Sequence, residues 1–203
     1  MLRFSRQTGL GSAAPDFALP DTDGRVRSLA EFGDAPALLV AFICNHCPFV
    51  LHMIGGLTEF AREYAPRGLQ VVAISSNDTA EFPEDDYAHM ARFAAEQALT
   101  FPYLHDAMQE VALAYGAICT PDLFLYDAGR RLFYAGQFDA SRPRIDRPPL
   151  PGAPPLRTDL PVTGEDLRAA TDALLGGAAA FEPQRPSAGC SIKWLPDKNP
   201  SWA

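Results

Sequence analysis

The sequence predicts an α/β fold with a central mixed sheet flanked by helices. Two continuous apolar runs, ALLVAFI at 37–43 and VVAISS at 71–76, are typical of strands buried on both faces of a parallel sheet. Between them, residues 49–64 place apolar side chains at three- and four-residue spacings, which predicts an amphipathic helix. Strand, helix and strand in this order form a βαβ unit.

Further patterns complete the predicted order of elements. The turn Asp127-Ala128-Gly129 lies between two apolar segments and indicates a hairpin. Thr163 and the acidic residues after it open a last helix, which ends at Gly176-Gly177. The expected elements are helices at 83–98 (after an acid-rich start), 108–115 and 167–175, and strands at 123–126 and 131–134.

The length of 203 residues, 47% of them hydrophobic, suits one domain with a full core. We expect a single domain over residues 1–180. Residues 142–161 are too rich in proline for a helix or a central strand, so they predict a loop inserted before the last helix. Residues 181–203 predict an irregular C-terminal tail.

Composition excludes several classes of function. Lys and Arg number 17 against 25 Asp and Glu, a net charge of −8 that would repel nucleic acid and anionic membranes. We find neither an apolar run of the roughly 20 residues that a membrane helix needs nor the apolar segment of a signal peptide, so we expect a cytoplasmic protein. Four cysteines are too few for a disulfide scaffold, so a close pair in a reducing compartment indicates catalysis or metal binding.

The pair in question is Cys44 and Cys47 in FICNHCPFV, where the first strand becomes the first helix. Residues three apart in a helical first turn lie close enough for a disulfide. The helix N-terminus should lower the pKa of the first thiol below its ordinary value of about 8.5. Protonated His46 should add to this effect and make the pair more oxidising than proline at that position would. Pro48 suits a first helical turn.

A structural zinc site is the alternative interpretation of a CxxC pair. Structural zinc needs about four ligands, commonly as two close pairs, and the sequence has no second CxxC. His52 gives C-x2-C-x4-H, but Leu57 stands where a zinc knuckle needs its last cysteine. We therefore expect no metal, and nothing in the sequence indicates another cofactor.

Four motifs, APDF at 14–17, CNHCP at 44–48, CTPD at 119–122 and GCSIKW at 189–194, carry a family resemblance. The chain resembles the alkyl hydroperoxide reductase/thiol-specific antioxidant (AhpC/TSA, Redoxin) branch of thioredoxin-like proteins, in a subgroup with CNHCP and GCSIKW. The resemblance covers nearly the whole chain. It implies a thioredoxin-like fold with an N-terminal β extension.

The resemblance also implies a second part of the site. Thr120-Pro121 is placed to form the cis peptide bond that faces the CxxC pair in thioredoxin-like folds, and Thr120 backbone groups would pair with an extended substrate. Cys44 at the helix tip is expected to attack a partner disulfide, and Cys47 to resolve the mixed disulfide. Cys119 is either a small buried apolar residue or a third redox cysteine. Cys190 is either a resolving thiol that docks onto the site or an exposed bystander.

Together these features predict a thiol–disulfide oxidoreductase that acts on a disulfide-containing protein or a small-thiol substrate and uses an unidentified reductant. The strand before Cys44 carries no buried carboxylate, so proton transfer would use His46, water or an acid such as Asp122. A thiol peroxidase is the main alternative, although Cys44 and Val40 stand where the peroxiredoxin PxxxTxxC loop has threonine and proline. The other alternative is a redox-sensing module that binds a partner through the proline-rich insertion.

Overall fold

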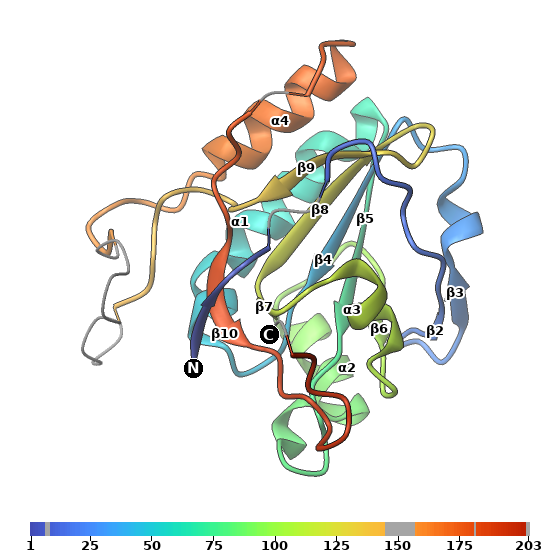
Figure 1. Ribbon diagram of the computed structural model, residues 1–203, viewed down its shortest axis with the longest axis vertical. Helices are drawn as coiled ribbons and strands as arrows, with labels where there is room; N and C mark the ends of the chain where they lie inside the picture. Colours follow the sequence, from blue (N-terminus) through green and yellow to red (C-terminus); the bar gives the residue numbers. More distant parts are fainter. Residues whose placement is uncertain (7–8, 145–156, 181, 202–203) are drawn as a thin grey trace.

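The computed structural model describes residues 1–6, 9–144, 157–180 and 182–201 (Figure 1). Its main sheet has five strands in the order β6-β5-β4-β8-β9. β5 pairs parallel with β4 and β6, whereas β8 pairs antiparallel with β4 and β9. The expected α/β, thioredoxin-like fold with a mixed central sheet is confirmed. The strands are β4 (Ala37–Phe42), β5 (Leu69–Ser75), β6 (Tyr103–His105), β8 (Asp122–Asp127) and β9 (Leu132–Gly136).

Helices cover both faces of this sheet. Buried side chains of α1 (Pro48–Tyr64), α2 (Tyr87–Glu96) and α4 (Glu165–Leu175) share one core with one face of the strands. Side chains of α3 (Glu110–Tyr115) and the short helix η1 (Leu29–Phe32) share a second core with the other face. Figure 1 shows α4 lying beside α1, with β2 and β3 on the far side of the sheet.

The central strand explains the longest apolar run of the sequence. All six residues of β4 are buried, and they alternate between the two cores, with Leu39 in one and Val40 in the other. A strand buried on both faces needs apolar residues at every position instead of at every second one. β4 therefore places the residues that follow it, 43–47, at the C-terminal edge of the sheet.

The helix expected over 83–98 is broken, and this prediction was wrong at its start. Residues Pro83–Asp85 form a separate short 3₁₀ helix, η3, and α2 begins only after Asp86. The Asp86 side chain accepts a hydrogen bond from the backbone N–H of His89 at 2.9 Å, which caps α2. Asp85 is thereby left free to turn into the protein, where it is fully buried.

The C-terminal tail is not irregular as expected, because it contains strand β10 (Ala188–Ser191). β10 lies between β1 (Leu2–Phe4) and β7 (Cys119–Thr120) in a second, three-stranded antiparallel sheet. β2 (Ala18–Pro20) and β3 (Val26–Ser28) form a hairpin that completes the N-terminal β extension. The tail thus belongs to the folded domain and reaches the segment that precedes Pro121.

The proline-rich insertion at 142–161 falls mostly outside the described residues, which leave out 145–156. The described ends of the insertion are held together. Ser141 and Arg157 form a parallel bridge, and the Arg142 N–H donates to the Arg157 carbonyl at 3.0 Å. The described residues on either side of 145–156 are therefore neighbours in the fold.

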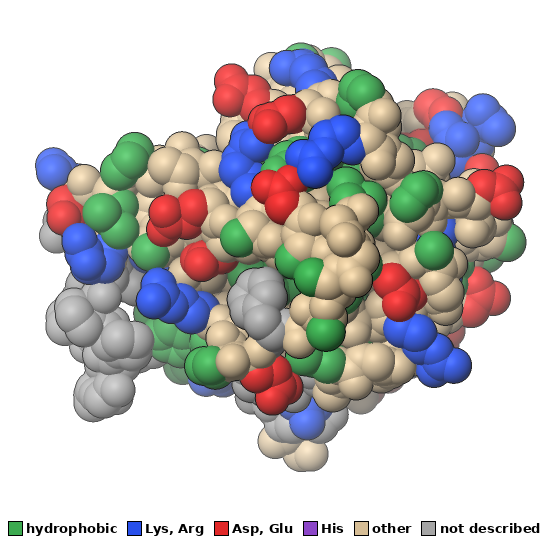
Figure 2. Space-filling model, turned by 90° about the horizontal axis from the view of Figure 1, so that it is seen from above, with side chains coloured by type: hydrophobic (Ala, Val, Ile, Leu, Met, Phe, Trp, Pro, Cys, Tyr) green, Lys and Arg blue, Asp and Glu red, His purple; other side chains and the backbone are tan. Residues whose placement is uncertain are grey.

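Charged side chains of both signs lie on the surface. On the face seen in Figure 2, basic and acidic side chains are interspersed, and neither sign forms a broad patch. Arg67 and Asp172 form an ion pair, at 2.7 Å, between the segment after α1 and helix α4. Within the described ranges, we find no helix that is long and apolar enough to cross a membrane.

Candidate active site

The CxxC pair lies in the turn between β4 and α1. α1 begins at Pro48, with Cys47 as its N-cap residue in an extended conformation, so Cys44 lies four residues before the first helical residue. The expectation that Cys44 occupies the helix tip was therefore wrong. Proline at the first helical position fixes where the helix starts, because it requires no hydrogen-bond acceptor for its nitrogen. Both cysteines are free thiols and are 0% exposed.

Thr120 and Pro121 face the pair, as the sequence predicted. The peptide bond between them is cis. The Cys44 Sγ lies 3.4 Å from Thr120 Oγ1, and the Cys47 thiol donates to the Thr120 carbonyl oxygen at 3.0 Å. One residue therefore contacts both sulfurs, although 73 residues or more separate it from them in the chain.

The two thiols titrate as one unit. Contact with Cys47 and burial raise the pKa of Cys44 well above its ordinary value. Burial opposes ionisation of Cys47 as well, but hydrogen bonds from Cys190 and Cys44 and the backbone N–H of Val50 outweigh burial and lower its pKa. The pair therefore loses its first proton more readily than a free thiol and its second less readily.

The lowered pKa falls on Cys47, whereas the sequence predicted it for Cys44. The main causes are the hydrogen bonds from the Cys190 and Cys44 thiols, and the Val50 amide at the start of α1 adds a smaller contribution. The Thr120 carbonyl oxygen acts in the opposite direction, because it can only accept a hydrogen bond and so favours a proton on Cys47. These opposed contacts allow the proton to be shared between the two sulfurs.

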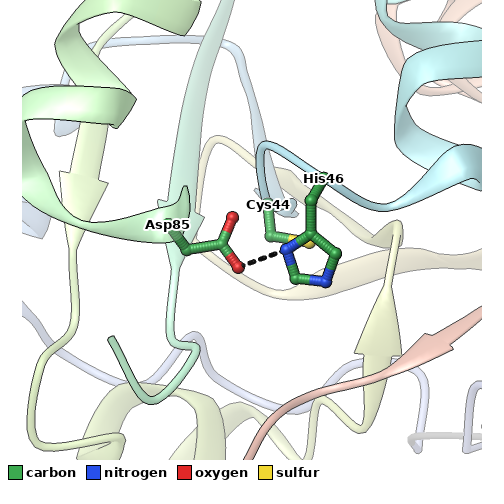
Figure 3. A group of neighbouring side chains, drawn as sticks. All are labelled: Cys44, His46 and Asp85. Carbon is green, nitrogen blue, oxygen red and sulfur yellow. Dashed lines mark ion pairs between the residues drawn. The ribbon is translucent and has the colours of Figure 1, made fainter. Parts of the chain in front are cut away.

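His46 is paired with a buried carboxylate. Its Nδ1 lies 2.7 Å from an Asp85 oxygen in an ion pair (Figure 3). Contact with Asp85 raises the pKa of His46 despite partial burial. Burial favours the neutral form of Asp85, but contacts with His46 and Asn77 outweigh it and lower the pKa of that carboxyl. The His46 ring also stacks on Phe82, with centroids 5.7 Å apart.

Sequence reasoning missed Asp85 as a site residue, because its position in an acidic run indicated only a helix N-terminus. The Asp85 carboxylate accepts from the Asn45 backbone N–H at 2.8 Å and from Asn77 Nδ2 at 2.7 Å. Asn45 lies between the two cysteines, and its side-chain oxygen accepts from the Tyr103 hydroxyl at 3.0 Å. Asp85 thus holds both the backbone of the CxxC turn and the imidazole within it.

Replacing Asp85 by asparagine should lower the pKa of His46, because the anion that favours the imidazolium is removed. The raised His46 pKa stabilises the fold below the pKa of free histidine, about 6.5, and the lowered Asp85 pKa stabilises it above that of free aspartate, about 3.9. The loss in unfolding free energy should therefore be largest between about pH 4 and pH 6.5, at roughly 1 to 3 kcal/mol. An NMR titration of His46 and urea unfolding at several pH values measure both effects.

Asp86→Asn is the matched control, because this neighbouring carboxylate contacts His89 instead, at 2.8 Å. It should leave the His46 titration unchanged. An unchanged His46 pKa in Asp85→Asn would contradict the assigned role of the ion pair.

Cys44, His46 and Asp85 are also the group whose donor atoms could hold a metal, since these atoms all lie within 4.8 Å of one another. Three ligands are fewer than the four of a structural zinc site. Both Asp85 oxygens already accept hydrogen bonds from Asn45 and Asn77. Figure 3 shows the carboxylate turned toward the imidazole, with the Cys44 sulfur beside the ring. We interpret the group as an ion pair next to a thiol.

Asp122, the acid suggested from sequence, is 1% exposed and directly follows Pro121 in β8. Burial raises its pKa to about 8, although the Ile118 backbone N–H donates to its Oδ2 at 3.3 Å. Its charge also acts on neighbouring Cys119. A proton on Asp122 is therefore available at neutral pH, but His46 is the titratable side chain beside Cys44.

The two remaining cysteines differ in their surroundings. Cys119 is 0% exposed and donates to the Pro121 carbonyl at 3.4 Å, and burial raises its pKa well above the ordinary value. This environment favours a neutral, structural thiol. Cys190 is partly exposed, lies in β10 opposite Thr120 and contacts Cys47. The structure thus brings Cys44, Cys47 and Cys190 around Thr120.

The backbone edge that was expected to bind substrate is already occupied. β7, which contains Thr120, pairs with β10 in the register Cys190↔Thr120 and Ser191↔Cys119. The expectation of a free Thr120 edge was wrong for this structure, because the tail forms a strand that sequence reasoning did not predict. An extended substrate could use this edge only after β10 is displaced.

Comparison with known proteins places the chain among redox proteins. The profile of the AhpC/TSA family matches residues 10–135. A solved structure of a hypothetical protein from Sinorhizobium meliloti is 50% identical, covers 95% of this chain and 98% of that chain, and has a TM-score of 0.85. Two curated relatives carry redox names. They are a protein of Mycobacterium tuberculosis that bears a provisional peroxiredoxin name, 33% identical over 107 residues, and the thiol-disulfide oxidoreductase ResA of Geobacillus thermodenitrificans, 27% identical over 126 residues.

These curated matches are partial. The first spans 53% of this chain and 63% of the mycobacterial protein, less than two thirds of its length. The second spans 61% of this chain and 68% of ResA. The names of these relatives include both thiol–disulfide exchange and peroxiredoxin.

Proposed function

Because the chain belongs to the AhpC/TSA family of thioredoxin-like redox proteins, we propose that it is a thiol–disulfide oxidoreductase that cycles between the Cys44–Cys47 dithiol and its disulfide. The observation that carries the proposal is the convergence of both sulfurs on Thr120, at 3.4 and 3.0 Å. Two thiols in mutual contact, with a raised pKa on one and a lowered pKa on the other, suit sequential attack and resolution.

In this mechanism Cys44 attacks first. The pair first loses one proton to solvent, which the lowered pKa of Cys47 favours. The proton that remains on Cys44 then moves across the contact to Cys47, whose thiol donates to the Thr120 carbonyl oxygen. The Cys44 thiolate forms a bond to one sulfur of the substrate disulfide, and the other substrate sulfur leaves with the electron pair. The Thr120 hydroxyl can donate to the Cys44 sulfur in the starting state, and protonated His46 lies nearby as a cation.

Resolution returns the substrate in reduced form. Cys47 loses its proton and attacks the Cys44 sulfur of the mixed disulfide, which releases the second substrate thiolate. The enzyme is left with a Cys44–Cys47 disulfide, and two electrons have passed to the substrate. Because both cysteines are 0% exposed, the cycle requires a movement that uncovers Cys44.

We propose a disulfide-containing protein or a small disulfide as the substrate, with a separate reductant to restore the dithiol. A net charge of −8 opposes binding to nucleic acid and to anionic membranes. Since free thiols at all four cysteines suit a reducing compartment, we also propose that the protein works in the cytoplasm.

The proposal is tested by insulin reduction with dithiothreitol as the donor, run beside hydrogen peroxide consumption on the same preparation. We expect catalysed insulin reduction and slow peroxide turnover. Rapid peroxide turnover without insulin reduction would overturn the proposal. A single stoichiometric oxidation without turnover would instead indicate the redox sensor.

A thiol peroxidase is the second candidate, and one observation favours it. Cys47, at the N-terminus of α1, has the lowered pKa, and it is the cysteine that aligns with the reactive cysteine of peroxiredoxins. Against this candidate, the positions of the peroxiredoxin threonine and proline hold Cys44 and Val40, and Val40 lies buried within β4. The chain therefore lacks the side chains that orient peroxide in that loop.

A further inference from the structure

Strand β10 carries a third cysteine to the CxxC pair. β10 is hydrogen bonded on one side to β1 and on the other to β7, and the register places Cys190 directly opposite Thr120. Thr120 is the residue that contacts both Cys44 and Cys47. Cys190 packs against the core that contains those two sulfurs, and its thiol contacts Cys47.

The close approach of β10 to β7 depends on Gly189. A Cβ atom at this position would lie 2.1 Å from the Thr120 carbonyl oxygen and 2.5 Å from its carbon, far inside contact distance. Only glycine at position 189 lets β10 lie against the backbone of Thr120, whose carbonyl oxygen accepts the hydrogen bond from Cys47. The position of Cys190 is therefore built into the backbone.

The segment after Cys190 is anchored at three further points. The Ile192 N–H donates to the Ile118 carbonyl at 3.0 Å, and the Lys193 N–H donates to Asn77 Oδ1 at 2.9 Å. Gln109 donates to the Lys193 carbonyl at 2.8 Å and accepts from the Leu195 N–H at 2.8 Å. These contacts hold the tail in place and restrict the positions that the Cys190 sulfur can reach.

Cys190 also has the access to solvent that the CxxC pair lacks. It is partly exposed, whereas Cys44 and Cys47 are 0% exposed. Of these three sulfurs, Cys190 is therefore the one that an external dithiol can reach without entering the core.

We propose that Cys190 is a third redox cysteine, which draws Cys47 out of the Cys44–Cys47 disulfide and so relays the disulfide to the partly exposed edge of the protein. This proposal rests on the function proposed above and adds the route by which an external reductant restores the dithiol.

The relay is an exchange without net oxidation. Cys190 gives its proton to solvent, and its thiolate attacks the Cys47 sulfur. A Cys47–Cys190 bond forms, the Cys44–Cys47 bond breaks, and its electron pair leaves on Cys44. A donor dithiol then attacks Cys190, which releases Cys47 as a thiolate. This leaves a mixed disulfide between Cys190 and the donor. The second donor thiol breaks it and closes a disulfide within the donor, so two electrons enter the protein.

The first test maps disulfides in the Cys44→Ser variant after oxidation with diamide under native conditions, by mass spectrometry with free thiols blocked. We expect a Cys47–Cys190 disulfide, and Cys119→Ser added to this variant should leave it unchanged. A free Cys190, or a Cys47–Cys119 disulfide in its place, would overturn the proposal. Gly189→Ala keeps every remaining cysteine but prevents docking, so it should reduce the yield about tenfold or more. An undiminished yield would show that β10 does not hold Cys190 in place.

The second test follows the reduction of the oxidised protein by dithiothreitol. Cys190→Ser should slow this step about tenfold or more, whereas Cys119→Ser should match the wild type. Equal rates in the two variants would overturn the relay. Failure of the parent proposal looks different, since the wild-type protein would then not reduce insulin at all. Circular dichroism of each variant separates these outcomes from unfolding.

Discussion

Replacing Cys44 by serine is expected to lower the rate of insulin reduction on the order of 1,000-fold or more, because the hydroxyl of serine is a poor nucleophile toward sulfur. Cys47→Ser should also block turnover, but at the next step. Cys44 would still attack the substrate, and the mixed disulfide would persist without Cys47 to resolve it. The measurement is the steady-state rate together with non-reducing gels of each variant after incubation with insulin.

The assignment of Cys44 as the attacking sulfur rests on its neighbours. The Thr120 hydroxyl can donate to a Cys44 thiolate and the His46 cation lies nearby, whereas Cys47 faces the Thr120 carbonyl and Cys190. Trapping of insulin by Cys44→Ser and not by Cys47→Ser would reverse the assignment. Cys119→Ser is the control. Among the described residues, the Cys119 thiol has one hydrogen-bond partner, the Pro121 carbonyl. This variant should keep the wild-type rate.

Replacing Asp122 by asparagine is expected to change how the stability of the fold depends on pH. Burial raises the pKa of Asp122 to about 8, so between about pH 4 and pH 8 the folded state holds a proton that the unfolded state releases. Stability therefore falls as the pH rises through this range. The shift corresponds to a loss of up to about 5 kcal/mol at pH 8 and above.

Asparagine has nearly the same shape and no charge, so Asp122→Asn removes this loss. The variant should be close to the wild type at pH 5 and more stable than the wild type at pH 8.5, as measured by urea unfolding. The difference between the two proteins isolates Asp122, because the other titrating groups are common to both. If that difference is the same at the two pH values, the carboxyl does not titrate as a buried group.

These two predictions separate two tasks at the same edge of the sheet. Cys44, Cys47 and Thr120 are in contact and would carry the exchange of electrons. Asp122 lies behind them in β8, opposite Phe42 of β4. It lowers the stability of the fold because its carboxyl is buried. A loss of stability of this kind is typical of sites where a perturbed acid serves function.

Much of the central fold is determined by local sequence. The apolar run of β4 and the 3.6-residue spacing of α1 each extend over enough residues for the pattern to identify the element. Cys44, Cys47, Thr120 and Pro121 were likewise predicted as neighbours from their motifs, and the structure brings them together. By contrast, β6, β7 and β10 have three, two and four residues, too few for any periodicity to appear.

By itself, then, the sequence determined the βαβ unit and the place of the CxxC pair after β4, and its family resemblance implied the partner at Thr120-Pro121. Only the tertiary structure decided that Asp85 turns inward to His46, that Cys47 carries the lowered pKa and that β10 brings Cys190 to Thr120. The physical reason is distance along the chain. Strand pairing and ion pairing between segments 39 and 70 residues apart depend on how the core packs, and no local pattern records that packing.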